Sequence, residues 1–380
     1  MLPYAHQQIS DEDVDAVAAA LRSDWLTTGP RVPAFEAALA SATGARHAVA
    51  FSSGTAALHG ATSAAALGPG DEAITTPMTF AATANAVLYV GAEVRFADVL
   101  PGSLLIDPDL IAKALTSRTR AILPVDFSGQ PADYDAIAEI AAAAPGGRPV
   151  VIADAAHSLG ATWHRRSVGT LADMTVLSFH PAKIITTGEG GAVLTDDDAL
   201  AARLRRFRNH GIETELAART DWTYAMVDLG YNYRLTDLAA ALGTSQLDRL
   251  EAFLARRRRL AARYVERLSG HEALELPEIQ PAADPAWHYL FVQLRLERLR
   301  LDRGAVYRAL RAEGIGVNVH YIPVHQHPFY RSRYPGVSLP VAEAAYDRLL
   351  TLPLHAGMTD ADVDDVVAAL DKVTSAYRLG

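Results

Sequence analysis

The chain has 380 residues, and because a single hydrophobic core seldom serves a chain of this length, we expect two packed domains. Its 35 Lys and Arg residues are outnumbered by 44 Asp and Glu residues, so the formal net charge of −9 offers no general attraction to the phosphates of nucleic acids. The absence of cysteine excludes disulfides, thiolate metal sites and thiol nucleophiles.

The chain also lacks a basic and apolar leader at its N-terminus, and no segment has about twenty uninterrupted apolar residues. We therefore expect a cytoplasmic protein with neither a membrane nor a nucleic acid as its partner.

Short runs rich in Val and Ile alternate with alanine-rich stretches of helical length, a pattern typical of an α/β fold with a covered, mostly parallel sheet. The pattern predicts seven strands in one large layer: His47–Phe51, Glu72–Thr75, Glu93–Ala97, Ala121–Val125, Val150–Ala153, Thr175–Phe179 and Ala192–Thr195.

Capping signals at Ser10 and Thr359 predict an N-terminal and a C-terminal helix, because an acid follows each of them three residues later. A long charged helix is expected over Leu247–Leu268, followed by the proline-rich segment Leu276–Pro285. These features predict a large domain over residues 1–246, which includes an N-terminal arm, and a small α+β domain over residues 247–380. The small domain is expected to contain His288–Leu294 as a strand, Asp302–Glu313 as a helix, Val317–Tyr321 as a strand and Val341–Leu350 as a helix.

The segment Ser52–Leu58 follows the first predicted strand directly and opens an alanine-rich helix. Its small residues would expose backbone amides at a helix N-terminus, which suits a phosphate group. An ordinary helix cap explains the segment equally well.

Asp154 follows a buried strand, at the sheet edge where α/β proteins gather their ligands. An acid at this position could be a metal ligand, a helix cap or the partner of a protonated ring nitrogen, and considered alone Asp154 favours the helix cap.

Lys183 is one of three lysines in the chain, with Lys113 and Lys372, and only Lys183 lies among glycines after a strand. A partly desolvated lysine in such a loop has a lowered pKa and a free amine for covalent chemistry. We therefore prefer a reactive lysine to a solvated surface lysine at this position.

Several spaced motifs resemble those of the DegT/DnrJ/EryC1/StrS family of sugar aminotransferases, and the resemblance runs from about Tyr4 to the C-terminal helix. The motifs are Ser53-Gly54-Thr55, Thr79-Phe80, Asp154-Ala155-Ala156-His157, Ser178-Phe179-His180-Pro181-Ala182-Lys183, Gly188-Glu189-Gly190-Gly191 and Gly230-Tyr231-Asn232-Tyr233-Arg234. The resemblance implies a fold type I transferase that depends on pyridoxal 5′-phosphate (PLP), which alternates with pyridoxamine phosphate (PMP).

The resemblance also implies roles for individual residues. Lys183 would hold the cofactor covalently and move a proton between the cofactor and the substrate carbon. Asp154 would keep the pyridine nitrogen protonated. The other implied cofactor contacts are Ser53, Gly54, Thr55 and Ser178 around the phosphate, Phe80 on the ring and His157 near the ring hydroxyl. Without the neighbouring motifs, Phe80 would be read as a core aromatic residue.

Asn232 matches a family position that reaches the cofactor phosphate of a neighbouring subunit, which implies a homodimer with shared active sites. Considered alone, Asn232 is more typical of a turn before the helix expected near Thr236. The arginine runs Arg203–Arg208 and Arg256–Arg259 are interpreted as solvated helix faces that pair with nearby acids.

The resemblance implies substrate contacts in three segments, although packing at an interface is an alternative for Trp25 and Tyr321. The candidate residues are Tyr4, Trp25, Leu26, Thr27, Thr28, His320, Tyr321, Ile322 and His325. No metal site is predicted, because the pair His320 and His325 has no third ligand near it in the sequence.

Within the family, the loop His180–Gly191, residues 2–4 and the segment Tyr321–His325 look most like the branch of pseudaminic acid biosynthesis. That branch implies transfer of an amino group from glutamate to C4 of a UDP-linked 4-keto-6-deoxy-N-acetylhexosamine, which yields UDP-4-amino-4,6-dideoxy-N-acetyl-β-L-altrosamine.

Other functions remain open alternatives. Another nucleotide-linked 4-keto sugar could be the substrate: a UDP-4-keto pentose, or a dTDP- or UDP-linked 4-keto-6-deoxy-D-hexose. A related sugar dehydrase would have a histidine in place of Lys183, and a sensor of PLP or nucleotide sugars would have no turnover. A nicotinamide dehydrogenase is disfavoured because no Gly-x-Gly-x-x-Gly motif follows the first strand.

Overall fold

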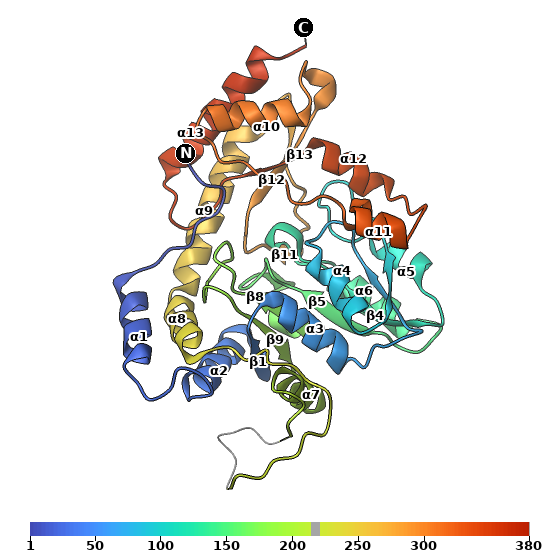
Figure 1. Cartoon of the computed structure of the whole chain (residues 1–380). Helices are drawn as coiled ribbons and strands as arrows, with labels where there is room; N and C mark the ends of the chain where they lie inside the picture. The colour runs from blue at the N-terminus through green and yellow to red at the C-terminus, as the bar shows by residue number, and fades with distance from the viewer. Residues whose placement is uncertain (214–220, 380) are drawn as a thin grey trace.

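The computed structural model describes residues 1–213 and 221–379, and a seven-stranded sheet lies at the centre of the fold (Figure 1). The strand order is β1-β9-β8-β5-β4-β2-β3, and β9 runs antiparallel to both of its neighbours while the other pairs are parallel. The bounds are β1 (His47–Phe51), β2 (Glu72–Thr75), β3 (Glu93–Phe96), β4 (Thr119–Leu123), β5 (Val150–Asp154), β8 (Met174–Ser178) and β9 (Gly191–Thr195). The α/β class and the seven predicted strands are confirmed.

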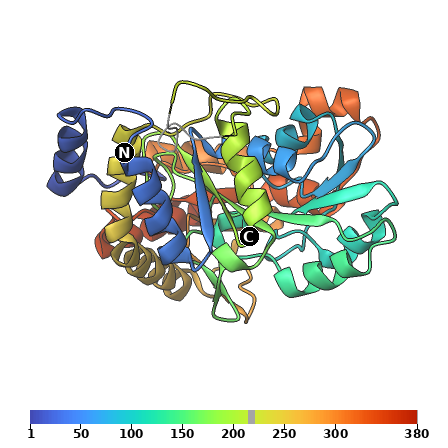
Figure 2. The ribbon, with the colours of Figure 1, turned by 90° about the horizontal axis from the view of Figure 1, so that it is seen from below.

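Helices cover both faces of this sheet because alternate strand residues point to opposite sides. One face packs on α3 (Gly54–Ala64), α4 (Ala82–Tyr89) and α7 (Asp198–Arg208) through side chains such as Val49, Leu123 and Val176. The other face packs on α2 (Arg31–Thr43), α5 (Pro108–Ala114), α6 (Tyr134–Ala142) and α8 (Asp237–Asp248). The predicted N-terminal helix is α1 (Asp11–Leu21), which packs beside α8 at the rim of the molecule in Figures 1 and 2.

The C-terminal part has its own core around the antiparallel sheet β10-β12-β13. Its strands are β10 (Leu274–Glu275), β12 (Leu290–Leu294) and β13 (Leu349–Leu352), and its helices are α9 (Leu250–Leu268), α10 (Arg303–Ala312), α11 (Pro328–Arg333), α12 (Pro340–Arg348) and α13 (Asp360–Ala376). A third sheet joins β11 (Ala283–Asp284) to β6 (Thr162–Trp163) and β7 (Arg166–Ser167), so it connects segments on either side of residue 246. The division of the chain at residue 246 stays a prediction.

Two expectations in this part were wrong. Val317–Tyr321 does not form a strand, because Gly316 is held against the N-terminal arm by Leu2 and only Asn318 pairs with Thr351. The helix expected over Val341–Leu350 ends at Arg348, and the apolar residues after it become β13 at the edge of the small sheet.

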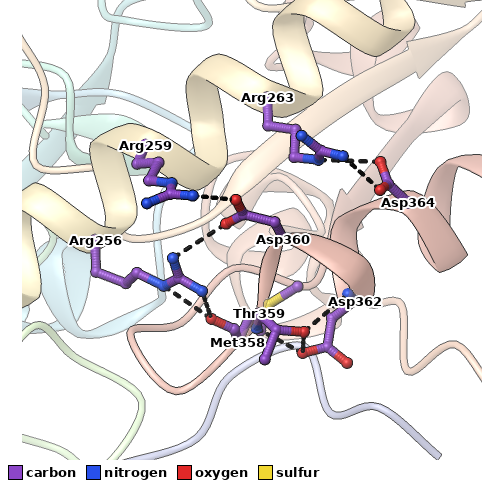
Figure 3. Close-up of polar contacts among 8 residues, drawn as sticks. All are labelled: Arg256, Arg259, Arg263, Met358, Thr359, Asp360, Asp362 and Asp364. Atoms are coloured by element: carbon purple, nitrogen blue, oxygen red, sulfur yellow. Dashed lines mark hydrogen bonds and ion pairs between the residues drawn. The ribbon is translucent and has the colours of Figure 1, made fainter.

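The arginine run on α9 pairs with acids at the start of α13 (Figure 3). Arg256 bonds Asp360 at 3.1 Å and donates to the carbonyl oxygen of Met358, while Arg259 pairs with the same carboxylate. Arg263 adds a pair with Asp364, in which its Nε lies 3.0 Å from the carboxylate. These contacts confirm the expected pairing with acids for Arg256 and Arg259, and they dock the predicted C-terminal helix, which begins with the capping box of Thr359. The expected solvated face was wrong at Arg257, which is buried and donates to backbone carbonyl oxygens.

The run on α7 departs from the expected solvated face at its end. Arg208 is buried, where it pairs with Glu36 and donates to the carbonyl oxygen of Ala50 at 2.9 Å. It therefore ties α7 to α2 and to the first strand.

Across residues 1–213 and 221–379, no helix combines the length and the apolar character needed to cross a membrane.

Candidate active site

A cavity of about 520 Å³ opens at the carboxyl ends of the parallel strands. Asp154 ends β5 and Ser178 ends β8, and the start of α3 lies beside both strands. This edge is where an α/β sheet gathers its ligands. The cavity brings together these predicted site residues: Tyr4, Ser53, Gly54, Thr55, Phe80, Asp154, His157, Ser178, Lys183, His320 and Tyr321.

The start of α3 lies against the end of β8 more closely than any side chain at position 54 would allow. A Cβ on Gly54 would lie 2.9 Å from the Cβ of Ser178, and one on Gly191 would lie 2.6 Å from the carbonyl oxygen of Ser53. Ser53 caps the helix by accepting from the amide of Ala56 at 3.1 Å. The cap and the phosphate interpretations are therefore compatible, because the first amides of α3 lie at the wall of the cavity.

Asp154 is buried at the end of β5, and its carboxylate accepts from the Thr83 hydroxyl at 2.7 Å and from the Ala156 amide at 3.2 Å. Burial raises the pKa of this carboxyl, while the hydrogen bonds and the charge of Lys183 act in the opposite direction. A turn rather than a helix follows Asp154, so the helix-cap alternative was wrong. Among the described residues, no three His, Cys, Asp or Glu side chains are grouped to hold a metal ion.

Lys183 lies in the loop between β8 and β9, where its amide donates to the carbonyl oxygen of His180 at 2.8 Å. Burial lowers the pKa of Lys183 to about 8, and the charge of Asp154 partly offsets this effect. An appreciable fraction of the amine is therefore neutral near pH 7 and can act as a nucleophile or a base.

Four further rings line the cavity, those of His157, Tyr321, His320 and Tyr4. His157 Nε2 lies 3.1 Å from the Tyr321 hydroxyl, and His320 Nδ1 lies 2.9 Å from the Thr351 hydroxyl. Burial lowers the pKa of His320 to about 3 and holds the pKa of His157 well below its usual range. Both imidazoles are therefore neutral, and Tyr4 packs against His320 with ring centroids 5.2 Å apart.

Phe80 lines the cavity with 63% of its surface exposed, so the core-aromatic alternative was wrong. An exposed ring at a cavity mouth is available to stack on a flat ligand.

Several candidates from the sequence do not line the cavity of this chain. Ile322 is exposed beyond it, and His325 is buried with its Nε2 2.9 Å from Glu343, an arrangement that lends no support to substrate contact. The remaining candidates outside the cavity lie in two other segments of the chain: Trp25, Leu26, Thr27, Thr28 and Asn232.

These two segments lie together on the surface. Thr27 pairs with Thr236, four residues after Asn232, and the Leu26 carbonyl oxygen accepts from the Asp237 amide at 3.0 Å. Asn232 is exposed, which leaves its turn role and its proposed role in a second subunit both open.

Sequence reasoning gave no role to four polar residues that line the cavity or bond to its members: Thr83, Glu189, His288 and Asn318. Thr83 lies one turn after Thr79, and the hydroxyls of the two residues are 2.7 Å apart, so the Thr79-Phe80 motif was the signal that could have found it. Glu189 lies within the motif Gly188-Glu189-Gly190-Gly191, which was its signal, whereas His288 and Asn318 carry no comparable local signal.

Comparison with known proteins shows similarity to sugar aminotransferases over nearly the whole chain. A sequence model of the DegT/DnrJ/EryC1/StrS aminotransferase family matches residues 7–371. Spore coat polysaccharide biosynthesis protein SpsC of Bacillus subtilis (strain 168) is 40% identical over 376 residues, which are 97% of this chain and 96% of that protein.

Solved structures of two aminotransferases superpose closely on the chain. The putative sugar aminotransferase Spr1654 of Streptococcus pneumoniae, in its PMP form, has a TM-score of 0.92 at 29% identity and covers 99% of this chain and 100% of its own. Helicobacter pylori PseC, described as an aminotransferase involved in the biosynthesis of pseudoaminic acid, has a TM-score of 0.93 at 28% identity with the same two coverages. Spr1654 is also known in a PLP form, which has a TM-score of 0.91.

Proposed function

The chain belongs to the DegT/DnrJ/EryC1/StrS aminotransferase family, whose members are PLP-dependent sugar aminotransferases, and we propose that it transfers the amino group of glutamate to C4 of a UDP-linked 4-keto-6-deoxy-N-acetylhexosamine. The product would be UDP-4-amino-4,6-dideoxy-N-acetyl-β-L-altrosamine. The observation that carries the chemistry is the pairing, in one cavity, of a lysine of lowered pKa with a buried aspartate.

The residues of the cavity fit PLP. The close approach at Gly54 and Gly191 supports a phosphate at the start of α3, held also by Ser53, Thr55 and Ser178. Phe80 offers a ring face. Within the described part of the chain, the buried Nδ1 of His157 has no hydrogen-bond partner, so the imidazole retains capacity for the ring hydroxyl.

When bound, PLP supplies an electrophilic carbon for an amine and a ring that accepts electrons from the carbon that loses a proton. Asp154 would hold a proton on the ring nitrogen, with its own orientation fixed by Thr83. Lys183 would release the cofactor to the donor amine and carry the proton to sugar C4, so the face that Lys183 occupies would set the stereochemistry of the new amine.

The choice of sugar rests on likeness to the pseudaminic acid branch in His180–Gly191 and Tyr321–His325, and on the superposition with Helicobacter pylori PseC over 99% of this chain. The similarity to SpsC, a spore coat polysaccharide biosynthesis protein, is also compatible with a different sugar substrate. The alternatives therefore remain a UDP-4-keto pentose or a 4-keto-6-deoxy-D-hexose linked to dTDP or UDP.

We expect kcat/KM for the UDP-linked 4-keto-6-deoxy-L-arabino N-acetylhexosamine to exceed that for its D-xylo counterpart and for the UDP-4-keto pentose by about tenfold or more, since a site built for a polar group rejects a ligand that misplaces it. Single-turnover reaction of the PMP form with each sugar, followed by mass spectrometry and NMR of the product, makes the comparison. A preference for either of the other two sugars would defeat the substrate assignment and leave amine transfer intact. Absence of turnover with every sugar, together with tight binding, would favour the sensor alternative.

We also propose that the protein is a cytoplasmic homodimer with shared active sites. Large apolar side chains are exposed along the segment that precedes Asn232, including Trp222 at 88%, Met226 at 65% and Leu229 at 72%. Trp25 and Leu26 are about half exposed and belong to the segment beside it. Several large apolar side chains exposed along neighbouring segments of one chain support an interface between subunits.

Mixing two impaired variants tests the sharing of sites. If Asn232 serves the neighbouring site, Lys183→Ala and Asn232→Ala chains should regain activity together, because one site of each hybrid dimer receives both intact residues. Random exchange would restore about a quarter of the parental activity, since half of the dimers are hybrids with one intact site each. Chains that exchange, as native mass spectrometry would report, but that fail to complement would indicate self-contained subunits.

A further inference from the structure

His288 lines the cavity, is 2% exposed, and stacks on the ring of His157. The two ring centroids are 4.4 Å apart and the planes differ by 28°. The ring of Tyr321 also lies nearly parallel to that of His157, at 6.2 Å and 16°, and is hydrogen-bonded to it. We propose that His288 is a positioning residue that fixes the ring of His157 against the cofactor. The inference rests on the cofactor contact proposed above for His157.

The backbone on both sides of His288 is held by a turn of the large sheet. Gly129 accepts from the Ala286 amide at 2.9 Å, Ser128 accepts from the His288 amide at 3.0 Å, and the Ser128 hydroxyl donates to the Tyr289 carbonyl oxygen at 2.6 Å. Three bonds from two adjacent residues fix the segment in register with the turn.

Gly129 brings the two histidines together. Its φ is +99°, and a Cβ there would lie 2.9 Å from both the His157 carbonyl oxygen and the His288 amide nitrogen. Only glycine fits this contact without displacing one of the two backbones. The separation of the imidazoles is therefore set by backbone contacts and not by the side chains alone.

Arg257 holds the same segment from α9. Its buried Nη1 donates to the carbonyl oxygens of His288 at 2.9 Å, Leu354 at 2.9 Å and Trp287 at 3.2 Å. Burial lowers the pKa of Arg257 to about 10, and the structure gives this guanidinium no carboxylate partner among the described residues. Because a buried cation is costly to leave unsatisfied, the three carbonyl groups are constrained to point at it.

The protonation state of the two imidazoles bears on how the ring of His157 is held. Burial holds the pKa of both imidazoles well below their usual range, and the charge of Lys183 adds to this effect, so both rings are neutral. With both rings neutral, the orientation of His157 depends on its hydrogen bond to Tyr321 and on its ring contacts, among which the stack on His288 at 4.4 Å has the shortest centroid distance. A stacked ring of this kind is worth about 2- to 13-fold in an equilibrium constant.

The test is a double-mutant cycle on the affinity of the cofactor-free enzyme for PLP, read by circular dichroism of the bound cofactor. His288→Ala should weaken binding by about tenfold in the parent, but by less than about twofold in a His157→Ala background, because the stack is then already lost. His288→Phe keeps a ring for the stack and should stay within about threefold of the parent. His271→Ala is the matched control, since His271 is partly buried beside Asp371, outside the cavity.

Equal losses for His288→Ala in both backgrounds would overturn the positioning role, because His288 would then act without His157. The same holds if His157→Ala is weakened and His288→Ala is not. A His157→Ala enzyme that binds PLP as tightly as the parent would instead remove the proposed cofactor contact and the positioning role with it. Failure of the parent to bind PLP at all would count against the proposed function. If His288→Ala does not fold, as judged by its thermal transition, His288→Gln replaces it in the cycle.

Discussion

Replacing Lys183 with alanine should abolish the borohydride-reducible link between protein and cofactor and lower the rate of amine transfer by at least about 10³-fold, because one residue both holds the cofactor and moves the proton. The cavity supplies no second lysine, since Lys113 is exposed on α5 and Lys372 is paired with Glu313 on the surface. Borohydride treatment of the PLP enzyme, followed by peptide mapping, locates the modified residue.

The exposed lysines provide the controls for this experiment. Lys113→Ala and Lys372→Ala should retain both the link and the activity, because neither side chain approaches the cavity. Modification of Lys113 or Lys372 in the parent enzyme would contradict the assignment of Lys183.

The lowered pKa of Lys183 has its own kinetic signature. Since the neutral amine is the nucleophile, the rate at which the cofactor-free enzyme captures PLP should rise with pH and level off above about 8. A lysine with the ordinary value of 10.5 would give a rate that still rises at pH 9. Stopped-flow absorbance between pH 6 and pH 10 separates the two cases, at ionic strength held constant, provided that the contribution of free PLP ionisation is subtracted.

The strands and the reactive residues were predictable because their signals are local. Most of the seven strands contain a short apolar run, Asp154 ends such a run, and Lys183 lies in the loop that follows another. Val317–Tyr321 has the alternating signal of a half-buried strand and yet forms none, because the N-terminal arm bonds Gly316 just before it and β13 pairs only with Asn318. Contacts between distant segments decided that case.

The role of His288 depends entirely on such distant contacts. Its partners are a turn at residues 128–129, a helix that carries Arg257 and the ring of His157, each at least 30 positions away in the chain. Periodicity and motif spacing report nothing about them. The same reasoning applies to Asn232, whose proposed partner lies on another subunit.

Replacing Asp154 with asparagine should leave an enzyme that still binds PLP but transfers the amine at least about 10²-fold more slowly. The amide keeps the shape of the carboxyl group, and it can still accept from the Thr83 hydroxyl, which lies 2.7 Å from the parent carboxylate. What the variant loses is the negative charge that keeps the ring nitrogen protonated, and that proton matters most as negative charge develops on the reacting carbon. The loss should therefore fall on the chemical step and leave cofactor affinity within about tenfold of the parent.

Single-turnover rates of the PMP form with the keto sugar, together with the PLP dissociation constant, separate the two effects. Thr83→Val provides a graded comparison, because it removes the donor to Asp154 and retains the charge and nearly the same volume, so its rate should lie between those of Asp154→Asn and the parent. In the parent, burial raises the pKa of Asp154, so this carboxyl becomes protonated as the pH falls. The rate of amine transfer in the parent should then fall on the acid side of its pH profile, towards the rate of the variant. Asp154→Asn should lack this acid limb. A near-parental single-turnover rate in Asp154→Asn, or an acid limb that survives in it, would assign the electron-sink role to another group.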